Sequence, residues 1–527
     1  MVSRYFGVAV MVGLVPSLVW AHSYRRIVEA EEVGAGPSFC TFPDGTHPPR
    51  GGIHCYEPQP FMEAYGIDRL HREGITGRGQ TIVLVDSFGS PTMQADLDTF
   101  SDTYHLPRKA IHFVYPNGVY VNPLTMPDPK DPTKKIPDPD KIGWAGETTL
   151  DLEWAHAIAP DAELVNVVTN VSETEGMAGL PELFHGIEMA AVRYPQGIVS
   201  MSFGTGEPTF TGQEVDDSLR GAFHQIFEKA TQGGMTLLAA TGDNGTAGAN
   251  LEVTSMMDIQ VVGYPASDPL ITAVGGTALE YGWKWDPQGA ISDYMDCKSR
   301  QNLQRATNPT ATPTACPKDI LNSALIAGSR VESVWKEDWA LAAGGGGVST
   351  VFEAPDYQAV LAANLKRLLA DHRGIPDLSM NAAINGGVVT YGSYQAQAWG
   401  STGGTSAATP EVAALVALAG QRASDILGRP VAIGSLNRLL YALGTEDFHD
   451  IVPTSFGAQN QVVVDNNGLY FSDLALQIFG AGTETPVEVP GYKATPGYDL
   501  ATGFGTPVAD RLVEDLAQAR AAELRLP

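Results

Sequence analysis

The chain has 527 residues, of which 43% are apolar, so it can bury a large core and is not a largely disordered protein. Its formal net charge is −27, from 60 acidic and 33 basic side chains. This charge argues against nucleic acid and anionic membranes as partners, because both would repel it.

The first 21 residues have the layout of a secretory signal peptide. Arg4 precedes an apolar run over residues 6–19, and small or helix-ending residues lead to Ala21. We expect cleavage after Ala21 and a secreted, extracellular protein. No later stretch is apolar over the roughly eighteen residues that a membrane span needs. An uncleaved anchor is the alternative.

Four cysteines form two couples that are local in the sequence, Cys40 with Cys55 and Cys297 with Cys316. This usage suits an oxidising compartment. Three pairings are formally possible, and we favour the local one over the others and over free buried thiols. No cysteine spacing resembles a zinc site.

Short runs rich in apolar and β-branched residues alternate with stretches that fit helices. This alternation predicts an α/β fold, with a doubly wound parallel sheet, helices on both faces and a single large domain. Functional residues of such sheets lie just past the carboxyl ends of the strands, where Asp86, Ser202 and Asp243 occur. The predicted strands cover residues 81–86, 163–168, 198–203, 235–241 and 271–275.

A helix is predicted over residues 146–160, where a proline ends it. Glu147 and Asp151 lie four residues apart and therefore share one face of this helix. Two carboxylates so placed repel each other in water, and a shared proton would explain their proximity. A solvated acidic face is the alternative.

Residues 239–245 form an apolar strand that runs into Asp243 between two glycines. Close approach of the backbone to a ligand is one explanation of these glycines, and a plain turn is the other.

Residues 403–410 read Gly-Gly-Thr-Ser-Ala-Ala-Thr-Pro, and a buried helix is predicted over residues 411–419. The pattern indicates a serine nucleophile, Ser406, on a strand-to-helix turn. An ordinary loop before a core helix is the alternative.

Three stretches are interpreted as loops or insertions at the surface, and an amphipathic helix is predicted near the end, over about residues 508–524. The three stretches cover residues 126–141, 296–329 and 454–489.

Together these segments resemble the sedolisins, the serine-carboxyl peptidases that share the subtilisin fold. The resemblance covers about residues 55–515. Besides Glu-x-x-x-Asp and Gly-Thr-Ser-x-x-x-Pro, the chain contains further family motifs in family order, at residues 64–67, 200–204, 265–267, 272–277 and 373–377.

The resemblance implies a subtilisin-like peptidase domain over residues 55–527 and a serine-type endopeptidase that acts on polypeptide substrates. We expect a monomer. Sedolisins commonly carry a long propeptide, whereas the similarity here begins near Tyr56. We therefore expect residues 22–54 to form only a short extension, without a full-size prodomain.

By position, the resemblance makes Ser406 the nucleophile, Glu147 its general base, Asp151 the residue that orients Glu147, and Asp243 the residue that faces the oxyanion. Near pH 4 a histidine is almost wholly protonated, whereas a glutamate is about half ionised and can accept a proton. Asp243 must be protonated to donate to the oxyanion, beside the backbone N–H of Ser406. We therefore expect an acidic optimum.

Two other functions stay open. The first is a subtilisin-type triad of Asp86, His156 and Ser406, although the His-Gly-Thr-His signature is absent and His156 lies on a different helical face from Glu147. The second is a catalytically silent, secreted binding protein on the same scaffold. Phe203 stands where many sedolisins have tryptophan in the strand that lines the substrate cleft, so subsite preference is expected to differ.

Residues 448–451 and 497–507 resemble the two halves of the sedolisin calcium site. The resemblance implies one Ca²⁺, and hard oxygen ligands suit this ion better than zinc. A loop without metal is the alternative, since a long insertion separates the two halves and Thr495 stands where the family often has glycine. The implied ligands are the carboxylates of Asp450 and Asp499 and the carbonyls of Ile451, Thr495 and Gly497.

Overall fold

The computed structural model describes most of the chain. The predicted signal peptide and the couple Cys297 and Cys316 lie outside the described residues. Within them, a disulfide joins Cys40 to Cys55, as predicted. The described residues are 40–46, 54–173, 179–250, 256–284, 324–337, 340–394, 398–456, 462–471 and 487–525.

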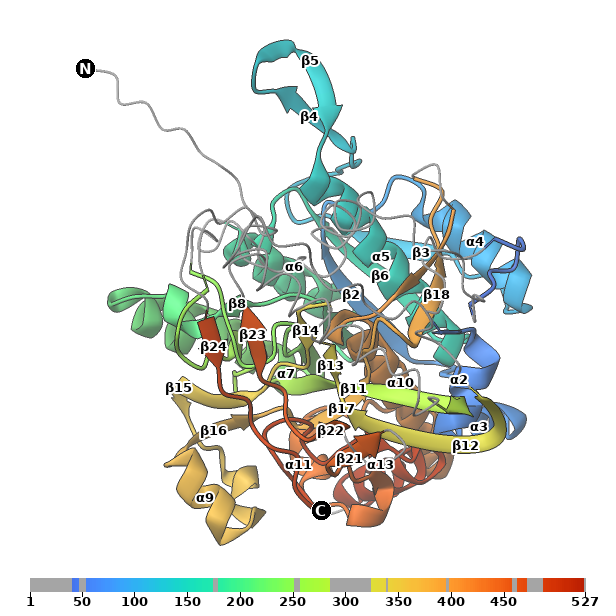
Figure 1. Cartoon of the computed structure of the whole chain (residues 1–527). Coiled ribbons are helices and arrows are strands. Elements are labelled where there is room, and N and C mark those ends of the chain that lie inside the picture. The colour runs from blue at the N-terminus through green and yellow to red at the C-terminus, as the bar shows by residue number, and fades with distance from the viewer. Residues whose placement is uncertain are drawn as a thin grey trace, which may run out of the picture.

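An eight-stranded sheet runs through the molecule (Figure 1), in the order β12-β11-β9-β7-β2-β6-β3, with β17 paired to β11. All the pairings are parallel except that of β12 with β11. The five predicted strands are confirmed. The strands are β2 (Thr81–Ser87), β3 (Ile111–Val114), β6 (Glu163–Thr169), β7 (Ile198–Met201), β9 (Thr236–Ala240), β11 (Thr272–Lys284), β12 (Ala324–Val334) and β17 (Leu378–Asn381).

The strand β11 continues well past its predicted end at residue 275. Its first half pairs with β17 at Val274–Thr277, and its second half pairs with β12 as far as Lys284. The two partners overlap at Thr277, which pairs with Asn381 of β17 and with Val334 of β12. The added length of β11 was not apparent from the short apolar run.

Helices cover both faces of the sheet, as a doubly wound fold requires. Ile82 and Leu84 of β2 belong to one core cluster, and Val83 and Val85 belong to another. Alternate side chains of a strand point to opposite faces, so the continuous apolar run of β2 feeds two cores. The first core holds α5 (Pro139–Ile158), α10 (Thr405–Leu427) and α13 (Ala509–Glu523), and the second holds α6 (Leu180–Arg193), η3 (Val215–Phe223) and α7 (His224–Gln232).

Two of the helices that carry predicted site residues are longer than their sequence predictions. The helix α5 begins at Pro139, because Asp138 caps it by accepting a hydrogen bond from the Lys141 N–H and proline fits the first helical position. The helix α10 begins at Thr405 and contains Pro410. Ser406 therefore lies inside the first turn of α10, and the predicted start at residue 411 is wrong.

The stretch 126–141 was interpreted as a loop, but most of it forms a two-stranded hairpin that projects from the body of the protein (Figure 1). The strands are β4 (Thr125–Asp128) and β5 (Asp131–Pro137). Proline is compatible with them because each strand pairs on one side only. The predicted surface location of this stretch is correct, but the prediction that it is a loop is wrong.

The stretch 454–489 is also more ordered than a surface insertion. It contains β21 (Thr454–Phe456), β22 (Val462–Val464), β23 (Leu469–Phe471) and β24 (Val487–Val489). Leu469 and Val489 are buried in a small cluster with Ala247 and Ala343. The hairpin β23–β24 therefore packs on the protein, and reading this part as a surface excursion is wrong. Of the stretch 296–329, the described part belongs to β12.

The remaining elements surround this framework, and none of the helices in the described part combines the length and apolarity that a membrane crossing needs. They include β1 (Cys55–Tyr56), α2 (Pro58–Tyr65), α3 (Ile67–Arg72), α4 (Met93–Tyr104), β8 (Thr205–Gly206), β10 (Gly263–Tyr264), β13 (Lys336–Glu337), β14 (Ala342–Ala343), β15 (Gly347–Glu353), α9 (Ala363–Leu369), β16 (His372–Ile375), β18 (Gly387–Tyr391), β19 (Trp399–Thr402), α11 (Leu436–Leu440), β20 (Phe448–His449) and β25 (Thr506–Pro507).

Candidate active site

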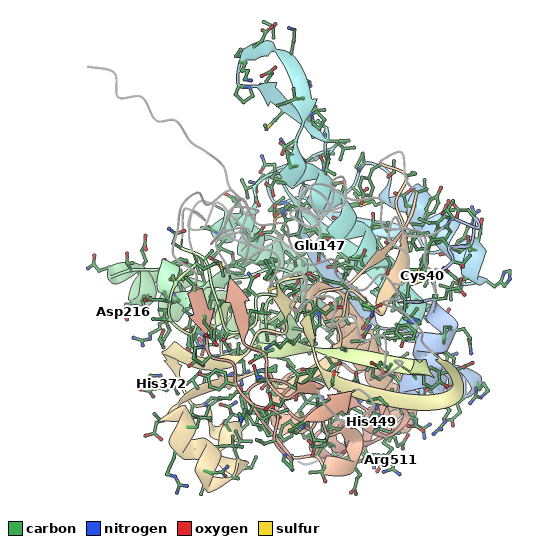
Figure 2. The ribbon with its side chains drawn as sticks, in the orientation of Figure 1. Cys40, Glu147, Asp216, His372, His449 and Arg511 are labelled. Atoms are coloured by element: carbon green, nitrogen blue, oxygen red, sulfur yellow. A yellow bond between two sulfur atoms is a disulfide. The ribbon has the colours of Figure 1, made fainter. Side chains whose placement is uncertain are left out.

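The helix α5 buries the two carboxyl groups that the sequence singled out. Glu147, labelled in Figure 2, is 3% exposed and Asp151 is fully buried. The alternative of a solvated acidic face is therefore wrong. The helix α5 packs against both α10 and the sheet.

Ser406 joins this pair from the first turn of α10. Its hydroxyl lies beside the Glu147 carboxyl group and lowers the pKa of that group. Gly404 precedes it with a φ of 112°, in the region that favours glycine, and a Cβ there would lie 2.7 Å from Asp243 Oδ2. The turn that presents the serine therefore requires glycine both for its backbone conformation and for space.

Burial dominates the electrostatics of the carboxyl groups. It raises the pKa of Glu147 well above its usual value; the hydrogen bond from Ser406 opposes this, and the neighbouring Asp86, Asp243 and Glu173 add to it. The pKa of Asp151 is also raised well above its usual value by burial, and then by Asp86 and Glu147. Burial raises the pKa of Asp86 to about 7. A cluster of this kind holds protons that isolated carboxylates would release.

A buried serine connects Asp151 to the nucleophile. The Ser202 hydroxyl lies 2.9 Å from Asp151 Oδ1 and 3.2 Å from the carbonyl oxygen of Ser406, and it can donate toward both acceptors. Ser202 follows β7 at the carboxyl edge of the sheet, as the sequence analysis expected of a functional position. It fixes the distance between the acidic pair and the start of α10.

Asp243 contacts α10 from the loop after β9. It is 7% exposed. Its Oδ1 accepts hydrogen bonds from the backbone N–H of Thr405, at 2.8 Å, and from the Thr405 hydroxyl, at 2.7 Å. Burial raises the pKa of Asp243 to about 6, against the effect of the two Thr405 hydrogen bonds. With Oδ1 engaged as an acceptor, Oδ2 is the oxygen at which a proton can be donated elsewhere.

A hollow beside Ser406 lies between the end of β7, the loop after β9 and the start of α10. Glycine and alanine make up half of its wall, so a bound extended chain could approach the protein backbone closely. The residues that line it are Ser202, Phe203, Gly204, Thr205, Gly206, Ala240, Thr241, Gly242, Asp243, Asn244, Gly245, Ala247, Gly248, Ala249, Val261, Gly263, Thr405 and Ser406.

His156 does not join this group. It is fully buried, and its Nε2 lies 2.8 Å from the carbonyl oxygen of Pro107. It is nine residues beyond Glu147, which is roughly 13 Å along a helix. Burial lowers the pKa of His156 to about 4. The geometry favours Glu147, and not His156, as the partner of the Ser406 hydroxyl.

The predicted calcium ligands come together in a second place, remote from Glu147; His449, the neighbour of Asp450, marks this region in Figure 2. Pairing of β20 with β25 brings Asp450 to the turn 495–499. The Gly497 N–H donates to Asp450 Oδ2 at 3.0 Å, and the Thr495 N–H donates to Asp499 Oδ2 at 2.8 Å. Asp499 is buried and Ile451 follows Asp450 directly.

The ligand set expected from the sequence, two carboxylates and three backbone carbonyls, would suit a hard cation. The described residues contain no group of three or more His, Cys, Asp or Glu side chains arranged to hold a metal. An ion here would therefore depend on carbonyl oxygens for part of its coordination.

The comparisons with known proteins agree with this geometry. Residues 143–435, more than half of the chain, match the model of the family described as the Subtilase family. The chain belongs to the subtilase family. The matched span contains all four proposed catalytic residues of this subtilase.

Within that fold, the subtilase is a member of the sedolisins, as its motifs predicted. It is 26% identical over 466 residues to Kumamolisin from Bacillus sp. (strain MN-32), covering 88% of this chain and 63% of that protein. It is 28% identical over 385 residues to Physarolisin from Physarum polycephalum, covering 70% of this chain and 56% of that protein. The chain thus spans less than two thirds of the length of these relatives.

The structure of Pseudomonas sedolisin, a serine-carboxyl proteinase complexed with two molecules of pseudo-iodotyrostatin, superposes with a TM-score of 0.58 at 19% identity. The match covers 89% of this chain and 100% of the sedolisin chain. It confirms the predicted subtilisin-like α/β fold.

Three residues of this subtilase that contact the site or its supports were not identified from the sequence. Glu173 follows β6 at the carboxyl edge of the sheet, and the strand-end rule that selected Asp86 would have selected it. Thr405 was part of the serine motif, but no pattern indicated that it binds Asp243. Asn467 lies in the stretch interpreted as a surface insertion, and nothing in the local sequence indicated its burial.

Proposed function

We propose that this subtilase is an acid-acting serine-carboxyl peptidase that hydrolyses peptide bonds through an acyl-enzyme on Ser406. The observation that carries the proposal is the placement of the Ser406 hydroxyl beside the buried carboxyl group of Glu147, whose pKa it lowers. A carboxylate in this position accepts a proton under acidic conditions, in which an ordinary histidine is already charged.

In the first step, Ser406 Oγ attacks the carbonyl carbon of the substrate while its proton passes to ionised Glu147. The electron pair of the carbonyl double bond moves to oxygen and forms the tetrahedral oxyanion. Glu147 then gives the proton to the leaving amine as the C–N bond breaks. Water repeats the sequence on the ester and restores Ser406.

Asp151 adjusts the basicity of Glu147. The pKa of Asp151 is raised by burial and by its acidic neighbours, so its carboxyl group retains a proton that it can share with Glu147. Ser202, which donates to Asp151 Oδ1, keeps that carboxyl group in a fixed orientation. Asp151 therefore supports the base without contacting the reacting carbonyl group.

Asp243 stabilises the oxyanion only when it is protonated. The backbone N–H of Ser406 is the second donor. Because burial raises the pKa of Asp243 to about 6, its carboxyl group is mostly neutral below that pH and can donate. Above it, the carboxylate would repel the developing negative charge. The acidic optimum follows from this group.

We also propose that one Ca²⁺ binds the cluster formed by Asp450, Asp499 and the turn 495–499. The side chains of Asp450 and Asp499 and the carbonyls of Ile451, Thr495 and Gly497 would hold it. The ion would neutralise two carboxylates and tie two distant segments together, which stabilises the fold. The proximity of Asp450 to the Gly497 N–H supports this assignment.

Secretion, polypeptide substrates, internal cleavage of those substrates and a monomeric state complete the proposal. The signal-like N-terminus and the disulfide support export. The open, glycine-lined hollow supports binding of an extended polypeptide.

The test is incubation of the purified protein with casein and with a quenched peptide at pH 3 to 5, beside the Ser406→Ala variant. Cleavage by the wild type alone supports the proposal. Equal signals from the two proteins would identify a silent binding protein. Mass spectrometry of the products separates internal cleavage from stepwise removal of short terminal peptides.

A further inference from the structure

The hairpin β23–β24 packs behind the loop that carries Asp243. Residues 242–245 of this loop run beside residues 342–345, and backbone hydrogen bonds join the two segments. The Ala343 N–H donates to the carbonyl of Asp243 at 2.9 Å, the Gly245 N–H donates to the carbonyl of Ala343 at 2.9 Å, and the Gly345 N–H donates to the carbonyl of Gly242 at 2.8 Å. The position of Asp243 therefore depends on the position of residues 342–345.

Asn467 also binds residues 342–345, through its side chain. It is fully buried, and its Nδ2 donates to the carbonyl of Gly344 at 2.9 Å. Its Oδ1 accepts from the Tyr492 N–H at 2.8 Å. One side chain thus connects the segment behind Asp243 to the second arm of the hairpin.

The loop also contacts the backbone of Asn467 directly. Gly245 has a φ of 61°, and a Cβ at this position would lie 2.0 Å from the carbonyl oxygen of Asn467. That distance leaves no room for any side chain. The loop of Asp243 is therefore enclosed between residues 342–345 and Asn467.

Further hydrogen bonds join residues 490–492, which follow β24, to Thr246 and Gln260. The Thr246 hydroxyl donates to the carbonyl of Pro490 at 3.0 Å, and Gln260 Nε2 donates to the same carbonyl at 2.7 Å. The Tyr492 hydroxyl lies 3.0 Å from Gln260 Oε1. The segment that follows β24 is thus attached to Thr246 and Gln260, which each adjoin a residue that lines the hollow beside Ser406.

We propose that Asn467 is a positioning residue of the oxyanion site, which holds the Asp243 carboxyl group in register with Ser406 through Gly344. The inference rests on the proposed role of Asp243 as an oxyanion donor. Catalysis by a hydrogen-bond donor is sensitive to small displacements, because the donor must meet the charge where it develops. Loss of Asn467 would also leave the Gly344 carbonyl and the Tyr492 N–H without these buried partners.

The first test compares Asn467→Ala with the wild type. We expect kcat to fall by about 10- to 100-fold with KM within about twofold, since a displaced donor weakens transition-state binding and leaves the substrate subsites in place. Asn437→Ala is the matched control, because Asn437 is also buried and bonds to the Ile271 carbonyl and Thr272, away from Asp243. Equal kcat values for the Asn467→Ala and wild-type enzymes would overturn the inference.

The second variant, Asn467→Asp, supplies a test that general destabilisation does not mimic. A protonated aspartic acid can still donate to Gly344, whereas an ionised one cannot. We expect Asn467→Asp to have activity near the wild-type level at pH 3. As the pH rises, the variant should lose its activity at a lower pH than the wild type does. An unchanged pH profile in Asn467→Asp would contradict the positioning role of Asn467. This test remains usable if Asn467→Ala fails to fold.

Hydrogen exchange gives a readout that does not depend on turnover. The amides of residues 242–245 and of Ala343 should exchange faster in Asn467→Ala than in the wild type, and Asn437→Ala should leave them unchanged. Unaltered exchange in Asn467→Ala would overturn the inference. If the wild type has no peptidase activity but the variants show the expected exchange pattern, the proposed function is refuted and the contact of Asn467 with the Asp243 loop is not.

Discussion

The Ser406 hydroxyl lies beside the Glu147 carboxyl group and lowers its pKa, although 259 residues separate the two in the chain. Each comes from a buried helix, α10 and α5, and these helices pack against each other on one face of the sheet. The pairing that we propose, of a nucleophile with a carboxyl base, thus lies in the core of the fold. Asp243 completes the site from the carboxyl edge of the sheet.

Replacement of Asp243 by asparagine should change the pH dependence of the reaction more than its maximum rate. Burial raises the pKa of Asp243 to about 6, so in the wild type the oxyanion donor is lost as pH rises through that value. An amide donates at any pH, and Asp243→Asn should retain activity to higher pH. Profiles of kcat/KM from pH 3 to 8 measure this.

The control for this variant is Asp216→Asn, at an exposed position that Figure 2 shows at the edge of the molecule. It should leave the profile unchanged. If Asp243→Asn loses activity over the same pH range as the wild type, Asp243 is not the group that limits activity on the alkaline side.

Replacement of Ser202 by alanine should weaken catalysis through Asp151. The lost hydrogen bond at 2.9 Å is to a buried carboxyl group, and such a bond contributes about 1 to 2 kcal/mol. We therefore expect kcat to fall by about tenfold. Ser200→Ala is the matched control, since Ser200 lies two residues before Ser202, in β7, and its hydroxyl has no hydrogen-bond partner among the described residues.

Equal rates for the Ser200→Ala and Ser202→Ala variants would show that Asp151 does not depend on Ser202. Steady-state kinetics at pH 4 and a thermal unfolding curve for each variant distinguish lost catalysis from lost stability.

Sequence periodicity and the strand-end rule predicted the sheet and the helices that cover it, because burial determines the apolar pattern of each element. The run of apolar residues in β2 and the spacing of Glu147 and Asp151 each reflect which faces are covered. The serine motif predicted the turn of Ser406, since Gly404 is required there by backbone conformation. The family resemblance, and not spacing alone, assigned the roles of these residues.

Contacts between remote segments could not be predicted in the same way. The bond from Thr405 to Asp243 and the burial of Asn467 depend on tertiary packing, which leaves no local periodicity. The hairpin at residues 125–137 contains four prolines and several charges, so its composition resembled a loop. Its strands form because each needs hydrogen bonds on one side only.

Replacement of His156 by glutamine should leave most activity in place. The imidazole bonds to the Pro107 carbonyl, and a glutamine amide can donate to the same acceptor. We expect kcat/KM at pH 4 within about threefold of the wild type, after correction for any change in stability. A loss of a thousandfold or more in a folded variant would instead support the subtilisin-type triad.

Removal of calcium should destabilise the protein. Dialysis against EGTA at pH 7 should lower the melting temperature, because a bound ion stabilises only the folded state, and added Ca²⁺ should restore it. Asp450→Asn should abolish this response. Asp465→Asn, in the preceding β-rich stretch, is the control and should respond like the wild type. An unchanged melting temperature after dialysis would count against the site.

The pH dependence of kcat/KM for the wild type and for Glu147→Gln, with one quenched peptide, tests the central claim most directly. We predict a wild-type maximum below pH 6 and a loss of at least about a thousandfold in Glu147→Gln at every pH, because the amide cannot accept the Ser406 proton. A wild-type maximum above pH 7, or a Glu147→Gln variant with activity near that of the wild type, would contradict the account.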